Sequence, residues 1–188
     1  MIYSPSPSNG ALRQGEVVTG LKQYPLSIQS VGSEATPIVD EQAIPFSIIL
    51  SQDCDLDLDY QARNGLNGVR PDKKLPSVLF CEIGLADEIF RPQEGMDAKI
   101  RRDIGQNKHE RYHFLQQVSQ SEDATGEGMA ALVIDFKRYL TMPTEEVYKR
   151  LALHAKRRCT LNSPYLEHLA TRFAYFQMRV ALPQDHQS

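Results

Sequence analysis

Hydrophobic and polar positions divide the first two thirds of the chain into short segments typical of β-strands. The residues Glu16–Leu21 follow Gly15 and indicate a first strand, while Pro25–Ser30 alternates apolar and polar residues, as a half-buried strand does. Ala43–Ser51 contains a continuous apolar run, which predicts a strand buried on both faces. Further strands are expected at residues 37–39, 77–83, 111–115 and 132–140.

Helical spacing appears once inside the chain and again at its end. Gly95–Asn107 carries Met96, Ile100 and Ile104 at a four-residue step, which predicts a helix. A second helix is expected from Thr144, with acids in its first turn and the basic residues 156–158 at its end, in agreement with the helix dipole. A third begins at Ser163-Pro164 and shows one apolar stripe, made of Leu166, Leu169, Ala170, Phe173, Phe176 and Val180.

This order of elements predicts an α+β protein: a small β-barrel or curled sheet with an inserted helix and a C-terminal helical pair packed at one side. A chain of 188 residues suits a single domain. We expect a flexible lead-in over residues 1–14, a barrel-like core over 15–143, the helices over 144–182 and a tail over 183–188.

Composition narrows the class of protein. The three cysteines lie far apart without a CxxC pair, which excludes a disulfide framework and the common structural zinc site. The first residues resemble no signal peptide, and no apolar run approaches the ~18 residues of a membrane span, so we expect a cytoplasmic protein. Charge is uneven, since residues 1–60 are acidic and residues 137–179 are basic. This asymmetry fits a basic face for nucleic acid or two solvated faces that meet between subunits, as in a homodimer.

The most distinctive segment is Pro45–Tyr60, where an apolar run ends in the sequence SQDCDLDLD. Cys54 stands between Asp53 and Asp55, at the expected exit of a buried strand. A nucleophilic cysteine needs a cation, a helix N-terminus or a histidine to stabilise its thiolate, and two carboxylates do the opposite. Either His109 or His113 would have to fold against Cys54 to make a catalytic group. The alternatives are a metal ligand and a turn residue whose aspartates cap backbone amides.

Aspartates recur at every second position of the same segment, at residues 53, 55, 57 and 59. In an extended chain these four carboxylates would share one face and could hold Mg²⁺, because that ion prefers oxygen ligands. The segment lacks the glycine and the glutamate of an EF-hand loop. An amphipathic, solvated edge is the more frequent reading of such a pattern, so no cofactor is assigned.

Two further segments could carry chemistry or binding. His109, Glu110 and Arg111 offer a base and a clamp for phosphate or carboxylate, although they equally suit a helix end and a strand start. Lys137, Arg138 and Tyr139 combine cations with an aromatic ring, which suits single-stranded nucleic acid or a partner protein. The aromatic residues of the last helix, Tyr165, Phe173, Tyr175 and Phe176, suit a core or a dimer seam.

The strings GEVVTGL, IPFSIILSQDC, SVLFCEI and ALVIDFKRYLTMP resemble, over about residues 15–143, the layout of the MazF/PemK-like family of SH3-type barrels. The resemblance implies an SH3-like barrel and a toxin–antitoxin or phage-defence setting. Ribonucleases of that family use an Arg before the Pro of the second core strand, where this chain has Ile44. The strings SQDCDL, QNKHERYHFL and SPYLEHLATRFAYFQMR also resemble a group of bacterial proteins to which we attach no activity.

Three hypotheses follow from these residues and this resemblance. The first is a non-catalytic binding or regulatory module of a bacterial toxin–antitoxin or phage-defence system, with a partner protein. The second is a nuclease that uses the acidic strand exit together with His109–Arg111. The third is an enzyme that depends on Cys54.

Overall fold

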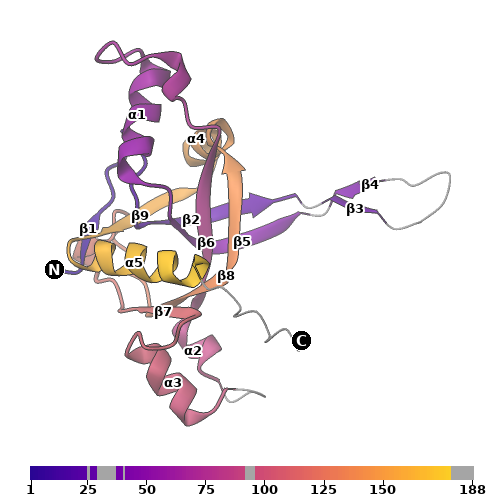
Figure 1. The fold of residues 1–188 in the computed structure, drawn as a ribbon, viewed down its shortest axis with the longest axis vertical. Helices are drawn as coiled ribbons and strands as arrows, with labels where there is room; N and C mark the ends of the chain where they lie inside the picture. Colours follow the sequence, from indigo (N-terminus) through magenta and orange to yellow (C-terminus); the bar gives the residue numbers. More distant parts are fainter. Residues whose placement is uncertain (25, 29–36, 40, 92–95, 179–188) are drawn as a thin grey trace, which may run out of the picture.

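The computed structural model describes residues 1–24, 26–28, 37–39, 41–91 and 96–178. Its centre is a seven-stranded antiparallel sheet with the strand order β1-β9-β2-β5-β6-β8-β7 (Figure 1). The strands are β1 Tyr3–Pro5, β2 Glu16–Gln23, β5 Gln42–Ile49, β6 Ser77–Leu85, β7 Tyr112–Leu115, β8 Leu132–Pro143 and β9 Lys156–Leu161. A separate two-stranded ribbon, β3 Leu26–Ile28 with β4 Pro37–Val39, projects away from the sheet (Figure 1).

Both faces of the sheet are covered, which explains the continuous apolar run in β5. Val17 and Ile48 belong to a core on the face covered by α5 (Tyr165–Gln177). Their neighbours Val18 and Ile49 belong to a core on the opposite face, under α1 (Asp53–Asn64) and α4 (Thr144–Leu153). A third cluster joins α2 (Ala86–Ile89) and α3 (Ala98–Gly105) to β8. Two 3₁₀ turns, Pro71–Lys73 and Gln120–Glu122, complete the elements of the described residues.

The two edges of the sheet approach each other without pairing. Tyr3 in β1 donates its hydroxyl hydrogen to the carbonyl of Gln116, just after β7, at 2.7 Å. Farther along, Arg158 in β9 accepts a hydrogen bond on its carbonyl from Ala124 N at 2.7 Å. The predicted α+β class is confirmed, and the sheet curls but stays open, so it does not form the closed SH3-like barrel.

The predicted strands within the described residues are confirmed, and the inserted helix is confirmed over Ala98–Gly105. Residues 25, 29 and 30 of the predicted strand Pro25–Ser30, and Gly95 of the predicted helix, lie outside the described residues.

The expected helical pair is wrong in one respect. Residues 156–161 form strand β9 between β1 and β2 instead of the end of a helix. The basic residues there form ion pairs with acids far away in sequence: Arg157 pairs with buried Glu16, and Arg158 pairs with buried Asp123. The acids after Thr144 and the basic run at 156–158 predicted a longer α4. The acidic partners of Arg157 and Arg158 are distant in sequence, so no local pattern indicates these pairs.

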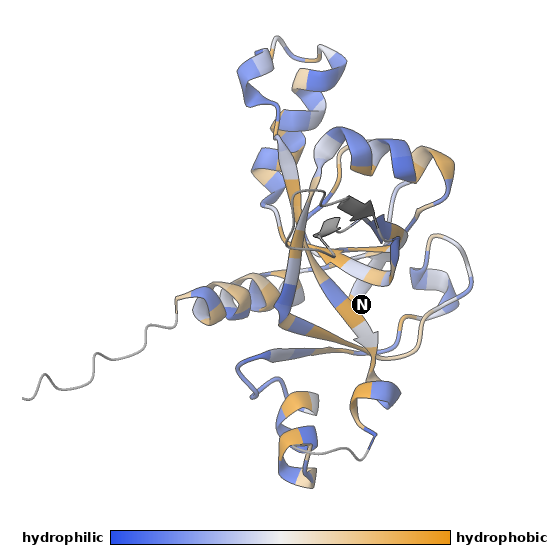
Figure 2. Cartoon of the chain, turned by 90° about the vertical axis from the view of Figure 1, so that its right-hand side faces the viewer, coloured by the Kyte–Doolittle hydropathy of each residue, from blue (hydrophilic) through white to orange (hydrophobic). Residues whose placement is uncertain are grey.

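The N-terminal residues also differ from the expected flexible lead-in. Tyr3 lies in β1, which pairs with β9, and Leu12 is fully buried in the core beneath α1 and α4. At the other end α5 confirms most of the predicted apolar stripe, with Leu169 and Phe176 buried on the sheet. In Figure 2 hydrophobic and hydrophilic positions interchange along this helix, as one buried stripe requires. Val180 and the predicted tail 183–188 lie outside the described residues.

No helix among the described residues is long and apolar enough to cross a membrane.

Candidate functional site

The acidic segment forms helix α1 rather than an extended edge. Leu56, Asp59 and Ala62 are buried at three-residue steps, and Gly65 ends the helix in the left-handed conformation with φ 63°. A helix turns about 100° per residue, so aspartates at alternate positions point in different directions. The four carboxylates therefore do not share a face, and the described residues contain no group of three or more His, Cys, Asp and Glu side chains that could hold a metal.

Two carboxylates of α1, Asp53 and Asp59, pair with arginines, whereas Asp55 is exposed. Arg13 holds Asp53 through two parallel hydrogen bonds, Nε to Oδ1 and Nη2 to Oδ2, both 3.0 Å long. Asp53 Oδ1 also accepts from Gln14 N at 2.8 Å. Asp59 is buried and accepts from Arg63 Nε at 2.7 Å. These bonds tie α1 to the N-terminal segment and to its own last turn.

Cys54 lies exposed in the first turn of α1. Its Sγ contacts two oxygens, Gln52 Oε1 at 3.7 Å and Asp55 Oδ1 at 3.9 Å. Neither histidine considered for it comes near, because His109 stacks on Tyr112 and His113 packs between Phe136 and His168. Neither histidine therefore stabilises a thiolate at Cys54, and of the three stabilising features (a cation, a helix N-terminus or a histidine) the structure supplies the helix N-terminus, beside the acids Asp53 and Asp55.

The second predicted segment, His109–Arg111, connects α3 to β7 and lies against α5. Arg111 pairs with Asp135 through two bonds of 2.7 and 2.6 Å. The main chain around it is held by Arg172 of α5, whose guanidinium donates to the carbonyls of Asn107, His109 and Tyr112. Glu110 lies beside Arg172 in a shallow hollow at the end of α5. Arg111 therefore binds a carboxylate of β8, and Arg172 binds backbone carbonyls, so both arginines stabilise the fold.

The two halves of the hypothetical nuclease site lie in different parts of the molecule. Figure 1 shows α1 at one end of the sheet, whereas β7 and α3 lie at the other. The groove beside Asp53, of about 570 Å³, is lined by the N-terminal segment, α1 and the end of β9, without any residue of 109–111. The structure therefore does not bring Asp53 and Asp55 together with His109, Glu110 and Arg111.

Lys137, Arg138 and Tyr139 lie at a bulge in β8. Between the paired positions Cys81 and Ile83 of β6, strand β8 runs from Tyr139 to Ile134, so it carries extra residues. All three side chains are exposed, Tyr139 to 51%. Arg138 Nη2 pairs with Glu82 Oε2 at 2.5 Å, while the ring of Tyr139 meets the edge of Phe173 in α5. Bulges commonly re-aim side chains next to functional sites.

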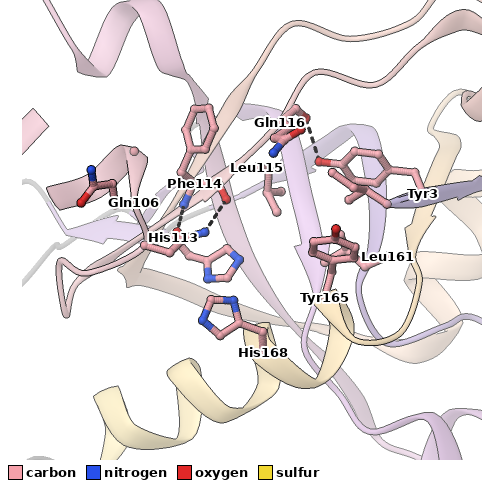
Figure 3. Close-up of a pocket in the computed structure, with 12 residues that line it drawn as sticks. Tyr3, Gln106, His113, Phe114, Leu115, Gln116, Leu161, Tyr165 and His168 are labelled. Carbon is pink, nitrogen blue, oxygen red and sulfur yellow. Dashed lines mark hydrogen bonds between the residues drawn. The ribbon is translucent and has the colours of Figure 1, made fainter. Parts of the chain in front are cut away.

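A pocket that the sequence did not reveal lies between β7, the end of α3 and the start of α5 (Figure 3). Its volume is about 290 Å³, and His113 forms part of its wall while being only 3% exposed. Burial, Arg172 and His168 lower the pKa of His113 to about 3, so the ring is neutral. No local signal marks this pocket, since its residues come from positions 2 to 168 of the chain.

No protein-family model matches this chain, and comparison with curated proteins yields no relative. The function therefore has to be argued from the side chains themselves.

Proposed function

We propose that this chain is a non-catalytic binding module that acts on a partner protein. One observation carries the proposal: two of the charged side chains that could have been catalytic, Asp53 and Arg111, are engaged in bidentate pairs that hold the fold. Asp53 is taken by Arg13, and Arg111 by Asp135. Each bidentate pair fixes the orientation of both side chains, so neither can turn toward a substrate without breaking two charge-assisted hydrogen bonds.

The β8 bulge is the surface we assign to the partner. Tyr139 offers a half-exposed ring supported from behind by Phe173, and Lys137 and Arg138 flank it. Ion pairs among the described residues engage Arg138 with Glu82 but leave Lys137 out. Tyrosine and arginine are enriched among residues that dominate binding energy. The charges favour an acidic segment of the partner. A regulatory role in a bacterial toxin–antitoxin or phage-defence system rests on the MazF/PemK-like resemblance.

The absence of catalysis is tested by turnover. Labelled single-stranded RNA and DNA are incubated with the purified chain, with and without Mg²⁺, beside the variants Asp53→Ala, Arg111→Ala and Cys54→Ser. We expect the same background for all proteins. Cleavage by the natural chain that disappears in Asp53→Ala or Arg111→Ala, with the variants still folded by circular dichroism, would overturn the proposal.

The binding surface is tested by charge and ring removal. Proteins captured from the source organism's extract by the natural chain are identified, and their affinity is measured for Lys137→Glu and Tyr139→Ala. We expect each variant to weaken binding about tenfold or more, in line with a hot-spot residue. The control Lys149→Glu changes the same charge on an exposed position of α4 and should bind normally. Equal losses in all three variants would remove β8 from the interface, and displacement of the partner by RNA would point to nucleic acid instead.

A further inference from the structure

The pocket beside His113 is enclosed by uncharged groups only. It is lined by residues of the segment Gly105–Gln116, of the first turns of α5, and of β1 and β9 near Tyr3. None of the residues that line it is an Asp, Glu, Lys or Arg. A charged ligand would lose its hydration there without gaining a counter-charge, which is costly. The lining therefore favours a neutral occupant and disfavours phosphate, carboxylate and metal ions.

Several polar groups of the wall already have partners. Tyr3 donates to the carbonyl of Gln116, as Figure 3 shows. The side-chain amide of Asn107 accepts from Phe114 N at 2.6 Å and donates to Phe114 O at 3.1 Å. These bonds brace the pocket and keep the end of α3 against β7. Tyr3 and Asn107 therefore already have hydrogen-bond partners within the protein, and a ligand would have to bind to other polar groups of the wall.

His113 differs from Tyr3 and Asn107 in the same pocket wall. Its Nδ1 is buried and has no hydrogen-bond partner. A buried polar atom without a partner costs about 1–3 kcal/mol, so such an atom in a folded protein calls for an explanation. The neutral imidazole has one donor and one acceptor nitrogen, and these point to different sides of the ring, so Nδ1 can pair with one donor or acceptor group of a ligand.

The side chains that border the open side of the pocket carry planar rings. Tyr165 is 42% exposed at the start of α5, and His168 is exposed one turn later on the same side of the helix. The imidazoles of His113 and His168 lie near each other, with centroids 5.3 Å apart (Figure 3). Rings at the rim suit a planar ligand, because aromatic groups stack or meet edge to face. Apolar side chains such as Leu115 and Leu161 fill the remaining wall.

We propose that this pocket binds a small, uncharged, planar nitrogen heterocycle of nucleobase type, with His113 as the buried recognition group and Tyr165 and His168 as the rim. The volume of about 290 Å³ lies at the small end of ligand pockets, which suits one such ring system rather than a large cofactor. This site is separate from the β8 surface proposed for the partner, so either proposal can fail without the other.

The test uses adenine, hypoxanthine, cytosine, uracil and nicotinamide as probes, with binding to the full chain measured by calorimetry. We expect at least one probe to bind, and His113→Phe to weaken it about tenfold or more, because the variant keeps the ring volume but removes both nitrogens. His154→Phe changes an exposed histidine after α4 and should leave the affinity unchanged. The bound probe should also shift the ¹⁵N resonances of His113.

Two further arms distinguish the sources of such a ring. Adenosine monophosphate carries the same base with a phosphate, and a short single-stranded RNA carries bases in a chain; both should bind more weakly than the free base. The proposal is overturned if no probe binds at millimolar concentration, if His113→Phe binds as well as the natural chain, or if the phosphate-bearing compounds bind more tightly.

Discussion

Arg111 holds Asp135 through two parallel hydrogen bonds, from Nε to Oδ1 at 2.7 Å and from Nη2 to Oδ2 at 2.6 Å. The same Oδ1 accepts from Lys137 N at 3.0 Å, which fixes the backbone where the β8 bulge begins. The carbonyl of Asp135 in turn accepts from Cys81 Sγ at 3.0 Å. A residue predicted as part of a catalytic group thus shapes the surface that we assign to the partner.

Replacing Asp135 should therefore loosen the bulge. Asp135→Asn keeps the size but loses the charge and one acceptor, so we expect about 1–2 kcal/mol less stability in urea unfolding, because Arg111 is partly exposed. Partner affinity should fall as well, since the position of Lys137 depends on this carboxylate. The exposed pair of Arg70 with Asp72 supplies the control, and Asp72→Asn should change neither quantity. An unchanged partner affinity in Asp135→Asn would separate the bulge from binding.

The buried pair of Asp123 with Arg158 should dominate the response to acid. Burial by itself raises the pKa of Asp123, but the bonds from Arg158 and Thr125 outweigh it and leave the pKa well below the usual range. The unfolded chain then binds a proton that the folded chain refuses, so this stabilisation is present above about pH 4 and is lost as pH falls toward the folded pKa.

Asp123→Asn removes the buried counter-charge of Arg158 and leaves it the exposed carboxylate of Glu127, 3.2 Å away, so we expect a loss of about 3 kcal/mol at pH 7. Urea unfolding at pH 7 and at pH 2.5 should show the difference between the two proteins shrinking in acid. A difference that stays constant over this range would contradict the assignment.

His113 should add a second pH dependence in a higher window. Its folded pKa of about 3 lies below the value of about 6.5 in an unfolded chain. Between these values only the unfolded chain takes up the proton, so stability falls with falling pH by about 1.4 kcal/mol per unit from this group. His113→Phe should flatten the slope of the unfolding free energy between pH 6 and pH 4.5, and His154→Phe should not.

Substitutions of Asp59 and Asp55 show whether the buried or the exposed carboxylates of the acidic segment stabilise helix α1. Asp59 is fully buried and accepts from both Arg63 and the backbone N–H of Leu75, at 2.7 Å each. We expect Asp59→Asn to cost about 3 kcal/mol, since it breaks a buried pair, whereas Asp55→Asn on the exposed face should change stability by less than about 0.5 kcal/mol. Thermal unfolding followed by circular dichroism measures both, and equal effects would contradict the structural role.

The three cysteines should differ in their reactivity toward thiol reagents, because they differ in solvent exposure. Cys54 is exposed, whereas Cys81 and Cys159 are buried, and burial raises the pKa of both, that of Cys159 to about 12. With Ellman's reagent at pH 8 we expect one thiol to react in the native chain and three after denaturation. Cys54→Ser should abolish the native reaction. Rapid reaction of a second native thiol would show that the sheet opens more readily than its burial implies.

The strands were predictable because their signals are local. Continuous apolar residues in β5 and β6 follow from burial on both faces, and Ile100 and Ile104 mark α3. Met96 lies before Asp97, the N-cap of α3, and packs against the same cluster as these two residues. Helix α1 also had local signals, namely Asp53 and Asp55 in its first turn, Arg63 in its last and Gly65 after it. Alternating aspartates suggested an extended segment instead, but Leu56, Asp59 and Ala62 show that the buried positions follow the helical period.

Sequence alone thus determined the strand-rich α+β character, the inserted helix and the apolar stripe of α5. Each of these depends on the spacing of apolar residues within a short segment of the chain. Only the tertiary structure decided that the sheet stays open and that residues 156–161 form a strand in it. It also decided the partner of each charged side chain, since Glu16 meets Arg157 and Asp123 meets Arg158 across long stretches of chain. The pocket at His113 is likewise a product of folding, because residues distant in sequence become neighbours only when the edges of the sheet curl together.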